Sequence, residues 1–412
     1  MDKKELLEYI INFYLTSGDF NGVPSYRLQD YETRDMLELI NEGLVETISE
    51  KESANPHIKG YDFELTTEQH AVNANGNNGQ VCFYPTQEAL KDVLADHSKP
   101  YTALLQKGCA QFEVIYFDIE VLERYINNPR YLISDYGYKG SICIQDDCWD
   151  ERLPVEYIQE YGMAYKKCGK IVRAAAVFVR DLSKLSSKVQ MLWKSFEHEN
   201  QAEYYVEPGF IKNAVLGEFV TKCWVFDALL EEMEIINQQC AAIGIPHLFK
   251  RTYRTSSAER PDGYGNILLP TLKNYYDFTL VMEKLLVHNI SIKTFQKNEG
   301  VIRAIERKNE DGTDKGSLTM FKEWLEKNVR ANFDIEAEII APLKKLRKDR
   351  QVPAHEPYSN EYDVDIYERQ KELVGDLYGA LRAIRSLFMG HPLAKTVQIP
   401  SYIFDGKDIV FY

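Results

Sequence analysis

Long hydrophobic runs are the first feature that this 412-residue chain lacks. No apolar stretch approaches the roughly 20 residues that span a bilayer, which excludes a membrane-spanning helix. The first residues, MDKKELLEYIINFYL, contain acidic Glu5 and Glu8 and are followed by no small-residue cleavage site, so they do not resemble a signal peptide. We therefore expect a cytoplasmic protein that makes no contact with a membrane.

Cysteine and glycine motifs are also missing. The seven cysteines include no C-x-x-C pair, and the closest two, Cys143 and Cys148, have no second pair to complete a tetrahedral zinc site. Gly137 and Gly140 have the wrong spacing for a phosphate-binding loop. The sequence therefore predicts reduced thiols, with no disulfide framework, no metal and no cofactor.

The chain has fewer basic than acidic residues. The chain has 49 Lys and Arg against 63 Asp and Glu, which gives a net charge of −14 and a pI of about 5.2. Nucleic acid repels such a chain on average. Contact with DNA or RNA therefore has to come from a local basic patch.

The remaining composition is typical of a folded, soluble protein, with 44% hydrophobic and 27% charged residues. The length exceeds what one hydrophobic core usually organises, so we expect two or three domains. The predicted class is α+β, mostly helical. We expect a small first domain over residues 1–65, a mixed α/β middle domain over 80–260 and a helical bundle over 267–412, with a polar boundary at 254–266.

Residues 1–65 are predicted to contain helices and one strand. Leu6 and Ile10 recur at helical spacing, Met36 and Leu39 mark another helix, and a strand follows at Glu46–Ile48. The segment LINEGLVETI resembles the third helix and first wing strand of winged-helix domains, which implies DNA binding.

Charge argues against DNA binding by this domain. Residues 1–60 contain six Lys and Arg against twelve Asp and Glu, and the presumed recognition helix carries Glu32, Asp35, Glu38 and Glu42. A protein–protein or structural role is therefore the preferred hypothesis for residues 1–65.

The middle region is predicted to mix short strands with helices. Strand-like runs occur at Phe112–Phe117, Gly140–Ile144 and Ala174–Val179. The segment NAVLGEFVTKCWVFDALLEEMEIINQQC places apolar residues from Val215 to Ile236 at spacings of three and four, which predicts one buried helix face.

From residue 267 the patterns predict three or four helices packed as a bundle. Apolar residues recur over 272–288, 321–329, 339–346 and 365–388, and Pro342 should kink the third helix or start a new one. The tail YIFDGKDIVFY is predicted to form a hairpin, because Asp-Gly is a turn signal between β-formers.

The stretch LKKLRKDRQVPAHEP gathers cations within this acidic chain. They are Lys344, Lys345, Arg347, Lys348 and Arg350, and His355 follows them. Arg offers a planar fork of donors that suits a phosphate, and His exchanges a proton near neutral pH. Together they supply what RNA cleavage without a metal needs, since one group stabilises charge on the phosphate and the other moves a proton.

We expect the helix to end or bend at Pro353, so that His355 folds back beside Arg350. Structural explanations of these residues, which require no function, are also possible. Basic residues favour the negative end of a helix. Arg350 could pair with Glu356 or Asp363, and His355 could be a turn residue.

The stretch LRKDRQVPAH resembles the R-x(4–6)-H motif at a helix end in HEPN domains, which are all-helical bundles of prokaryotic toxins, CRISPR-associated ribonucleases and anti-phage proteins. The resemblance covers roughly residues 267–395. It implies that Arg350 and His355 are the catalytic pair, that no metal is needed, that the product carries a 2′,3′-cyclic phosphate, and that two copies form one cleft as a homodimer. Gln351 stands where the family usually has Asn, Asp or His. The residues expected to contact RNA are Gln351, Lys344, Lys345, Arg347 and Lys348.

Two hypotheses follow. In the first, the chain is a metal-independent endoribonuclease of HEPN type, a toxin-like or anti-phage effector whose first 260 residues sense a signal or bind a regulatory protein. In the second, it is a non-catalytic interaction or regulatory protein with a winged-helix-like N-terminus and a helical dimerisation bundle. The first requires nucleic acid at Lys344–His355, whereas the second predicts duplex DNA at residues 25–50 or no nucleic acid.

Overall fold

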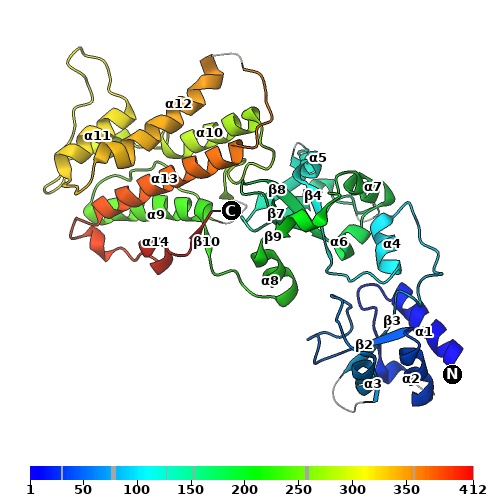
Figure 1. The fold of residues 1–412 in the computed structure, drawn as a ribbon. Coiled ribbons are helices and arrows are strands. Elements are labelled where there is room, and N and C mark those ends of the chain that lie inside the picture. The colour runs from blue at the N-terminus through cyan, green and yellow to red at the C-terminus, as the bar shows by residue number, and fades with distance from the viewer. Residues whose placement is uncertain are drawn as a thin grey trace. The chain divides into compact units, whose positions relative to one another are not determined.

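The computed structural model describes residues 1–28, 31–75, 80–126, 128–150, 152, 154–255, 259–355 and 358–411 (Figure 1). Its content, 46% helix and 15% strand, agrees with the mixed and mainly helical chain that the sequence predicts. The chain divides into two compact units. Unit 1 comprises Met1–Ile133, Gly140–Ala164 and Ala174–Glu207, and unit 2 comprises Ser134–Lys139, Tyr165–Arg173 and Pro208–Tyr412. The polar stretch 254–266 lies inside unit 2.

The first part of unit 1 is a three-stranded antiparallel sheet with helices. Its elements are α1 (Lys3–Thr16), β1 (Val23–Pro24), α2 (Thr33–Asn41), β2 (Val45–Ser49), α3 (Thr67–Asn75) and β3 (Val81–Pro85). The strand order is β1-β3-β2. The helices expected near residues 6 and 36 and the strand expected at 46–48 are confirmed as α1, α2 and β2. Strand β3 comes from residues that we placed in the middle region.

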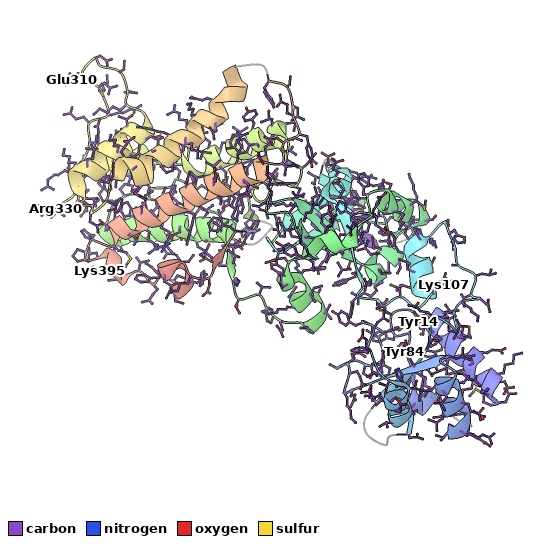
Figure 2. All side chains as sticks on the ribbon, viewed as in Figure 1. Tyr14, Tyr84, Lys107, Glu310, Arg330 and Lys395 are labelled. Carbon is purple, nitrogen blue, oxygen red and sulfur yellow. The ribbon has the colours of Figure 1, made fainter. Side chains whose placement is uncertain are left out.

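Local sequence explains how α1 begins and where it packs. The Asp2 carboxylate accepts the backbone N–H of Glu5 at 2.9 Å, and the Glu5 carboxylate accepts the backbone N–H of Asp2 at 3.0 Å, which forms a capping box. Leu6 is fully buried. Tyr14 meets Tyr84 of β3 edge to face, with ring centroids 6.5 Å apart (Figure 2). These contacts fix α1 on the sheet.

The second part of unit 1 is built around a six-stranded sheet. Its strands are β4 (Val114–Asp118), β5 (Tyr131–Asp135), β6 (Lys139–Ile144), β7 (Glu160–Lys166), β8 (Arg173–Phe178) and β9 (Tyr204–Val206), in the order β4-β8-β7-β6-β5 with β9 paired to β7. Helices α4 (Pro100–Gln106), α5 (Glu123–Ile126), α6 (Val179–Ser183) and α7 (Ser187–Ser195) accompany it. The three strands predicted from sequence are confirmed as β4, β6 and β8.

Unit 2 is mainly a helical bundle. Its helices are α8 (Pro208–Leu216), α9 (Val225–Ile243), α10 (Leu272–Leu286), α11 (Ser317–Asn328), α12 (Ala341–His355), α13 (Ile366–Phe388) and α14 (Ser401–Asp405). Two short strands, β10 (Cys223–Trp224) and β11 (Ile409–Val410), pair in parallel. The helices predicted over 272–288, 321–329 and 365–388 are confirmed as α10, α11 and α13.

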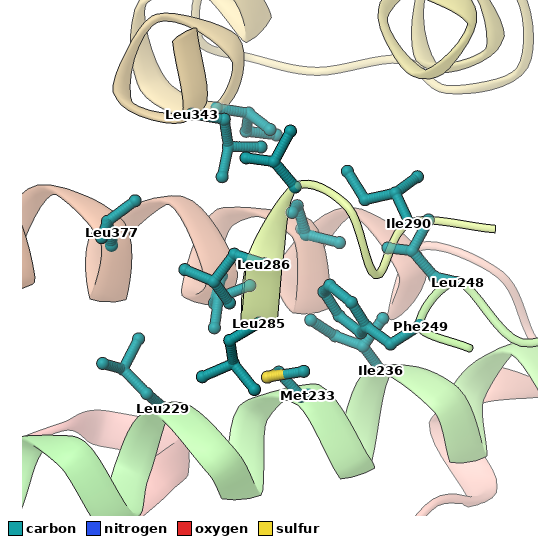
Figure 3. Packing of buried hydrophobic residues seen from close by; sticks show 14 of the residues in the cluster. Leu229, Met233, Ile236, Leu248, Phe249, Leu285, Leu286, Ile290, Leu343 and Leu377 are labelled. Carbon is teal, nitrogen blue, oxygen red and sulfur yellow. The ribbon is translucent and has the colours of Figure 1, made fainter. Parts of the chain in front are cut away.

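The bundle core lies between α9, α10, α12 and α13 (Figure 3). Leu229 and Met233 of α9, Leu285 of α10, Leu343 of α12 and Leu377 of α13 are all buried. Burying one such side chain contributes about 1.5–3 kcal/mol. These contacts hold α12, which carries the predicted site, against the rest of the bundle.

A buried ion pair joins α9 to α13. Nε of Arg385 lies 2.7 Å from Oε2 of Glu232, and the two side chains are 2% and 0% exposed. Arg385 Nη2 also donates to the carbonyl of Ile403 at 3.1 Å. Burial raises the pKa of Glu232 to about 7, even though the attraction of Arg385 lowers it.

The long helical pattern of residues 213–240 is split in the structure. Gly217, with φ +67°, follows the end of α8, and α9 begins only at Val225. Leu216 and Phe219 are 61% and 91% exposed. The predicted single buried face is therefore wrong for the first half of this segment, and it is confirmed for the half that forms α9.

The C-terminal tail also differs from its prediction. Residues 401–405 form α14, and Gly406 caps it in the left-handed conformation with φ +71°. Strand β11 then pairs in parallel with β10, with Ile409 opposite Cys223. The predicted hairpin is wrong, because the Asp-Gly pair ends a helix here and does not turn between two strands.

Candidate nucleic-acid interface

The cation-rich stretch forms α12, and a π-helical turn, Glu336–Ile340, leads directly into it. Pro342 is the second residue of α12, directly after the π-helical turn, so it lies inside a helical run that starts at residue 335 and not at a free helix start. Leu343 and Leu346 are 2% and 0% exposed and lie three residues apart, so they form the buried face of α12. We expected Pro342 to kink the helix or start a new one; the second alternative is wrong, because the helical residues run without a break from 335 through Pro342, and the first stays a prediction.

The opposite face of α12 carries the predicted RNA-binding cations. Lys344 Nζ lies 2.8 Å from Oε1 of Glu336, and Lys345 Nζ lies 3.1 Å from Oδ2 of Asp376. All four side chains of these pairs are about one-third to one-half exposed, so each pair contributes at most about 1 kcal/mol. A phosphate could therefore displace either carboxylate at little cost.

Two further cations of α12 have no partner among the residues that the structure describes. Arg347 and Lys348 are exposed, and neither forms an ion pair or hydrogen bond with any residue that the structure describes. Gln351 is exposed as well. The surface of α12 therefore offers positive charge within an otherwise acidic protein.

Arg350 lies on the side of α12 that also carries the buried Leu343 and Leu346, seven and four residues after them. It is half-buried and forms no ion pair or hydrogen bond within the described part of the chain. Its neighbour Asp349 accepts the hydroxyl of Tyr275 at 3.1 Å. Asp363, one of the two carboxylates that we considered as a structural partner for Arg350, accepts the backbone N–H of Asp365 at 3.0 Å. The other candidate, Glu356, lies outside the described residues.

His355 is the last residue of α12. We expected the helix to end or bend at Pro353; the end is wrong, since the helix continues two residues beyond it, and the bend stays a prediction. His355 is a helical residue, so the alternative that it is a turn residue is also wrong. The side chains of residues 352–355 lie outside the described part of the structure. Five residues along an α-helix correspond to about 140° of rotation and about 7.5 Å of rise. The helix therefore does not bring positions 350 and 355 to the same side of one chain.

The N-terminal helix considered for DNA binding has its cations neutralised. Arg34 lies within 4 Å of Glu32, Asp35 and Glu38. Lys3 lies 3.3 Å from Glu38. These ion pairs leave α2 acidic on balance, which disfavours contact with a phosphate backbone.

Unit 2 contains a buried polar network that no local pattern in the sequence indicates. Arg260 is hydrogen-bonded to the carboxylate of Asp227 and donates to the carbonyl of Asp135 at 2.6 Å. Burial raises the pKa of Asp227 to about 6 and outweighs the attraction of Arg260. Arg173 donates to the carbonyl of Ile267 at 2.6 Å. The nearby cavity has a volume of about 10 Å³, which suits a single water and no substrate.

Within the described residues, no group of three or more His, Cys, Asp or Glu is arranged to hold a metal ion. In the same part of the chain, no helix combines the length and apolar character needed to cross a membrane.

No family model, curated protein or solved structure matches this chain. The basic helix α12 is therefore the feature of this chain that indicates a function.

Proposed function

We propose that unit 2 is a metal-independent endoribonuclease of HEPN type in which Arg350 and His355 form the catalytic pair. The observation that carries the proposal is the environment of Arg350, which is half-buried and has no carboxylate partner among the described residues. A partly desolvated guanidinium gains most from an anion that it can hold through two parallel hydrogen bonds. A phosphodiester is such an anion, and the exposed cations of α12 would attract it.

The chemistry requires only side chains of this chain. Arg350 would stabilise the charge that develops on the scissile phosphate, and His355 would move a proton at the 2′-hydroxyl or at the leaving 5′-oxygen. The 2′-oxygen bonds to phosphorus while the bond to the 5′-oxygen breaks. The products are a 2′,3′-cyclic phosphate and a free 5′-hydroxyl. Arg347 and Lys348 would hold neighbouring phosphates of the RNA strand.

The helical spacing of the pair favours a homodimer. Positions 350 and 355 lie on different sides of α12, so an arginine from one copy and a histidine from a second copy could meet at a shared cleft. The resemblance to HEPN domains implies the same arrangement. We therefore propose that the active species contains two chains.

The remaining chain would regulate this activity. The chain order α1, β1, α2, β2 and the strand order β1-β3-β2 support the winged-helix-like unit at residues 1–65, with β3 at Val81–Pro85 added to its sheet; α3 lies between β2 and β3 in place of a short wing turn. Its paired charges favour a protein partner over DNA. In this proposal the protein is a cytoplasmic, toxin-like or anti-phage effector whose first 207 residues receive a signal or bind a regulatory protein.

Cleavage of total RNA in EDTA tests the proposal. We expect Arg350→Ala and His355→Ala each to lower the rate by about 100- to 10,000-fold, which is the usual effect of losing an acid–base or charge-stabilising group. Arg330→Ala, an exposed arginine elsewhere in unit 2 (Figure 2), is the matched control and should cleave like the wild type. Loss of the melting transition in either active-site variant would indicate a structural role. A wild-type protein that leaves every RNA intact would contradict the proposal.

A complementation experiment tests the dimer. Arg350→Ala and His355→Ala proteins, co-expressed with different tags and purified together, should regain part of the activity, because an arginine from one chain then meets a histidine from the other. Recovery is not expected when either variant is paired with the double variant. Absence of recovery in a confirmed mixed dimer would show that each chain acts alone.

A non-catalytic role in RNA binding is the second candidate, and the continuous helix through Pro353 favours it, since that helix separates the pair within one chain. Salt dependence of binding distinguishes the α12 face from other surfaces. Removing Arg347 and Lys348 together should reduce the slope of log affinity against log salt by about 1.4 for single-stranded RNA. Binding with an unchanged slope would place the RNA elsewhere.

A further inference from the structure

A groove in unit 1 carries exposed aromatic side chains that the proposed ribonuclease does not use. It has a volume of about 280 Å³, and its lining includes Phe13, Phe20, Pro24, Tyr26, Arg27 and His57. Phe20 and Tyr26 are 60% and 64% exposed. Single exposed aromatic residues are common on protein surfaces, but two that line the same hollow mark a binding surface.

The sheet holds both walls of this groove in place. Pro24 of β1 lies opposite Cys82 of β3, and the backbone N–H of Gly22 donates to the carbonyl of His57 at 3.1 Å. The segment that carries Phe20 is thus tied to the loop that carries His57. Such a preformed groove spares a ligand much of the cost of ordering the protein.

His57 contributes an aromatic ring that two neighbouring side chains hold in place. Its Nδ1 lies 3.5 Å from the sulfur of Cys82, and its Nε2 lies 3.0 Å from Oε1 of Gln80. Burial raises the pKa of Cys82 to about 12, so the thiol keeps its proton and can donate it to Nδ1. Both ring nitrogens therefore have a partner within the protein.

Arg27 is the one lysine or arginine among the described residues that line the groove. Its guanidinium lies 5.5 Å from the ring centroid of Phe13, and it forms no ion pair with a described residue. No carboxylate lines the groove in the described part of the chain. Asp19, which precedes Phe20, is paired with Lys184 at 2.9 Å. The lining therefore favours a ligand that is flat, aromatic and negatively charged.

We propose that this groove binds a free nucleoside monophosphate. The base would stack on Phe20 or Tyr26, and the phosphate would pair with Arg27. The volume lies near the lower limit of small-molecule pockets, about 300 Å³, which suits one nucleotide. Residues 1–60 have twice as many acidic as basic residues, so a long polyanion would be repelled more strongly than a monophosphate. No residue of this groove belongs to the proposed ribonuclease site, and neither proposal depends on the other.

Calorimetric titration of the full chain with AMP and UMP in EDTA tests this proposal. Tyr26→Ala and Phe20→Ala should each weaken binding by about 5- to 150-fold, which corresponds to the loss of one stacked base. Arg27→Met should weaken binding of AMP but leave binding of adenosine unchanged, because only the phosphate contacts the guanidinium. Phe404→Ala and Arg34→Met, which alter residues of similar exposure outside the groove, should bind like the wild type.

Several results would overturn the proposal. Ribose 5-phosphate binding as tightly as AMP would exclude stacking of the base. A single-stranded oligonucleotide, or an acidic peptide, that binds more tightly and responds to the same variants would identify a different ligand. Absence of binding by all four monophosphates at millimolar concentration would leave the groove without this function. Arg350→Ala protein should still bind AMP, so failure of the ribonuclease proposal would not change this outcome.

Discussion

Replacing Arg385 by methionine should destabilise unit 2 by about 3–5 kcal/mol at pH 8. The guanidinium of Arg385 is buried and lies 2.7 Å from the buried carboxylate of Glu232. Methionine fills a similar volume, but it leaves Glu232 without a cation and the carbonyl of Ile403 without its donor. Breaking a buried ion pair on one side is costly, because the remaining charge stays in the apolar core without compensation.

The size of this loss should depend on pH, because burial already raises the pKa of Glu232 from 4.5 to about 7. A carboxyl group whose pKa is raised by folding stabilises the fold fully below its unfolded pKa. That contribution to stability is lost as the pH rises through the pKa of the group in the folded state. Between pH 4.5 and pH 7 the wild-type protein therefore loses about 3 kcal/mol from this one group. Without Arg385 the folded pKa rises further, so the decline continues above pH 7.

Urea unfolding at pH 5 and pH 8, followed by circular dichroism and tryptophan fluorescence, measures both effects. The cost of Arg385→Met should be larger at pH 8 than at pH 5. Lys371→Met changes an exposed position of the same helix and should stay within about 0.5 kcal/mol of the wild type. Adding Glu232→Gln should remove the pH dependence and restore part of the stability. An Arg385→Met cost below about 1 kcal/mol, or one that is equal at both pH values, would refute the reasoning.

Two further predictions concern unit 1. Gly22→Ala should lower its stability by about 1–3 kcal/mol, because the added Cβ would clash with the hydroxyl of Tyr84. Calorimetric unfolding measures this loss, and Gly316→Ala, whose added Cβ would meet nothing within 4 Å, should unfold like the wild type. Lys59→Met should cost about 1–3 kcal/mol, because Lys59 is 4% exposed and its Nζ lies 2.7 Å from Glu46, whose side chain is 24% exposed and keeps contact with water. Urea unfolding that shows less than about 1 kcal/mol for Lys59→Met would mean that Glu46 finds another partner or water.

The helices of the bundle could be predicted from sequence because each buries one face. On α13, Leu373, Leu377, Leu381 and Ile384 repeat at spacings of three and four, and all are buried. Strand β7 offered no such signal. Its residues 161–165 are all buried, so no alternation of polar and apolar residues marks it as a strand.

Only part of the candidate site could be predicted in the same way. The cations of α12 and its buried Leu343 and Leu346 follow from helical spacing. The continuation through Pro353 does not, because a local rule that sees only the missing N–H predicts an end at that point. The contact between Arg260 and Asp135 spans 125 residues of sequence, and no local pattern announces such a pair. Long-range polar contacts of this kind form only when distant segments pack together, so local sequence does not predict them.

The division of the chain into units has a consequence for the order of folding. Unit 2 takes two short segments, Ser134–Lys139 and Tyr165–Arg173, from a stretch that otherwise belongs to unit 1. Arg173 donates to the carbonyl of Ile267 and, at 3.1 Å, to the side chain of Gln370, which lies 197 residues later. During synthesis this arginine leaves the ribosome long before Gln370 does, so the bundle closes only when the chain is nearly complete.

For the same reason the bundle is not a detachable module. A chain that begins at residue 208 lacks Arg173, and Gln370 and the carbonyl of Ile267 would lose a buried donor. Shortening the protein to isolate its basic helix would therefore disturb the fold that presents this helix. An assay of α12 therefore requires a chain that also contains Ser134–Lys139 and Tyr165–Arg173.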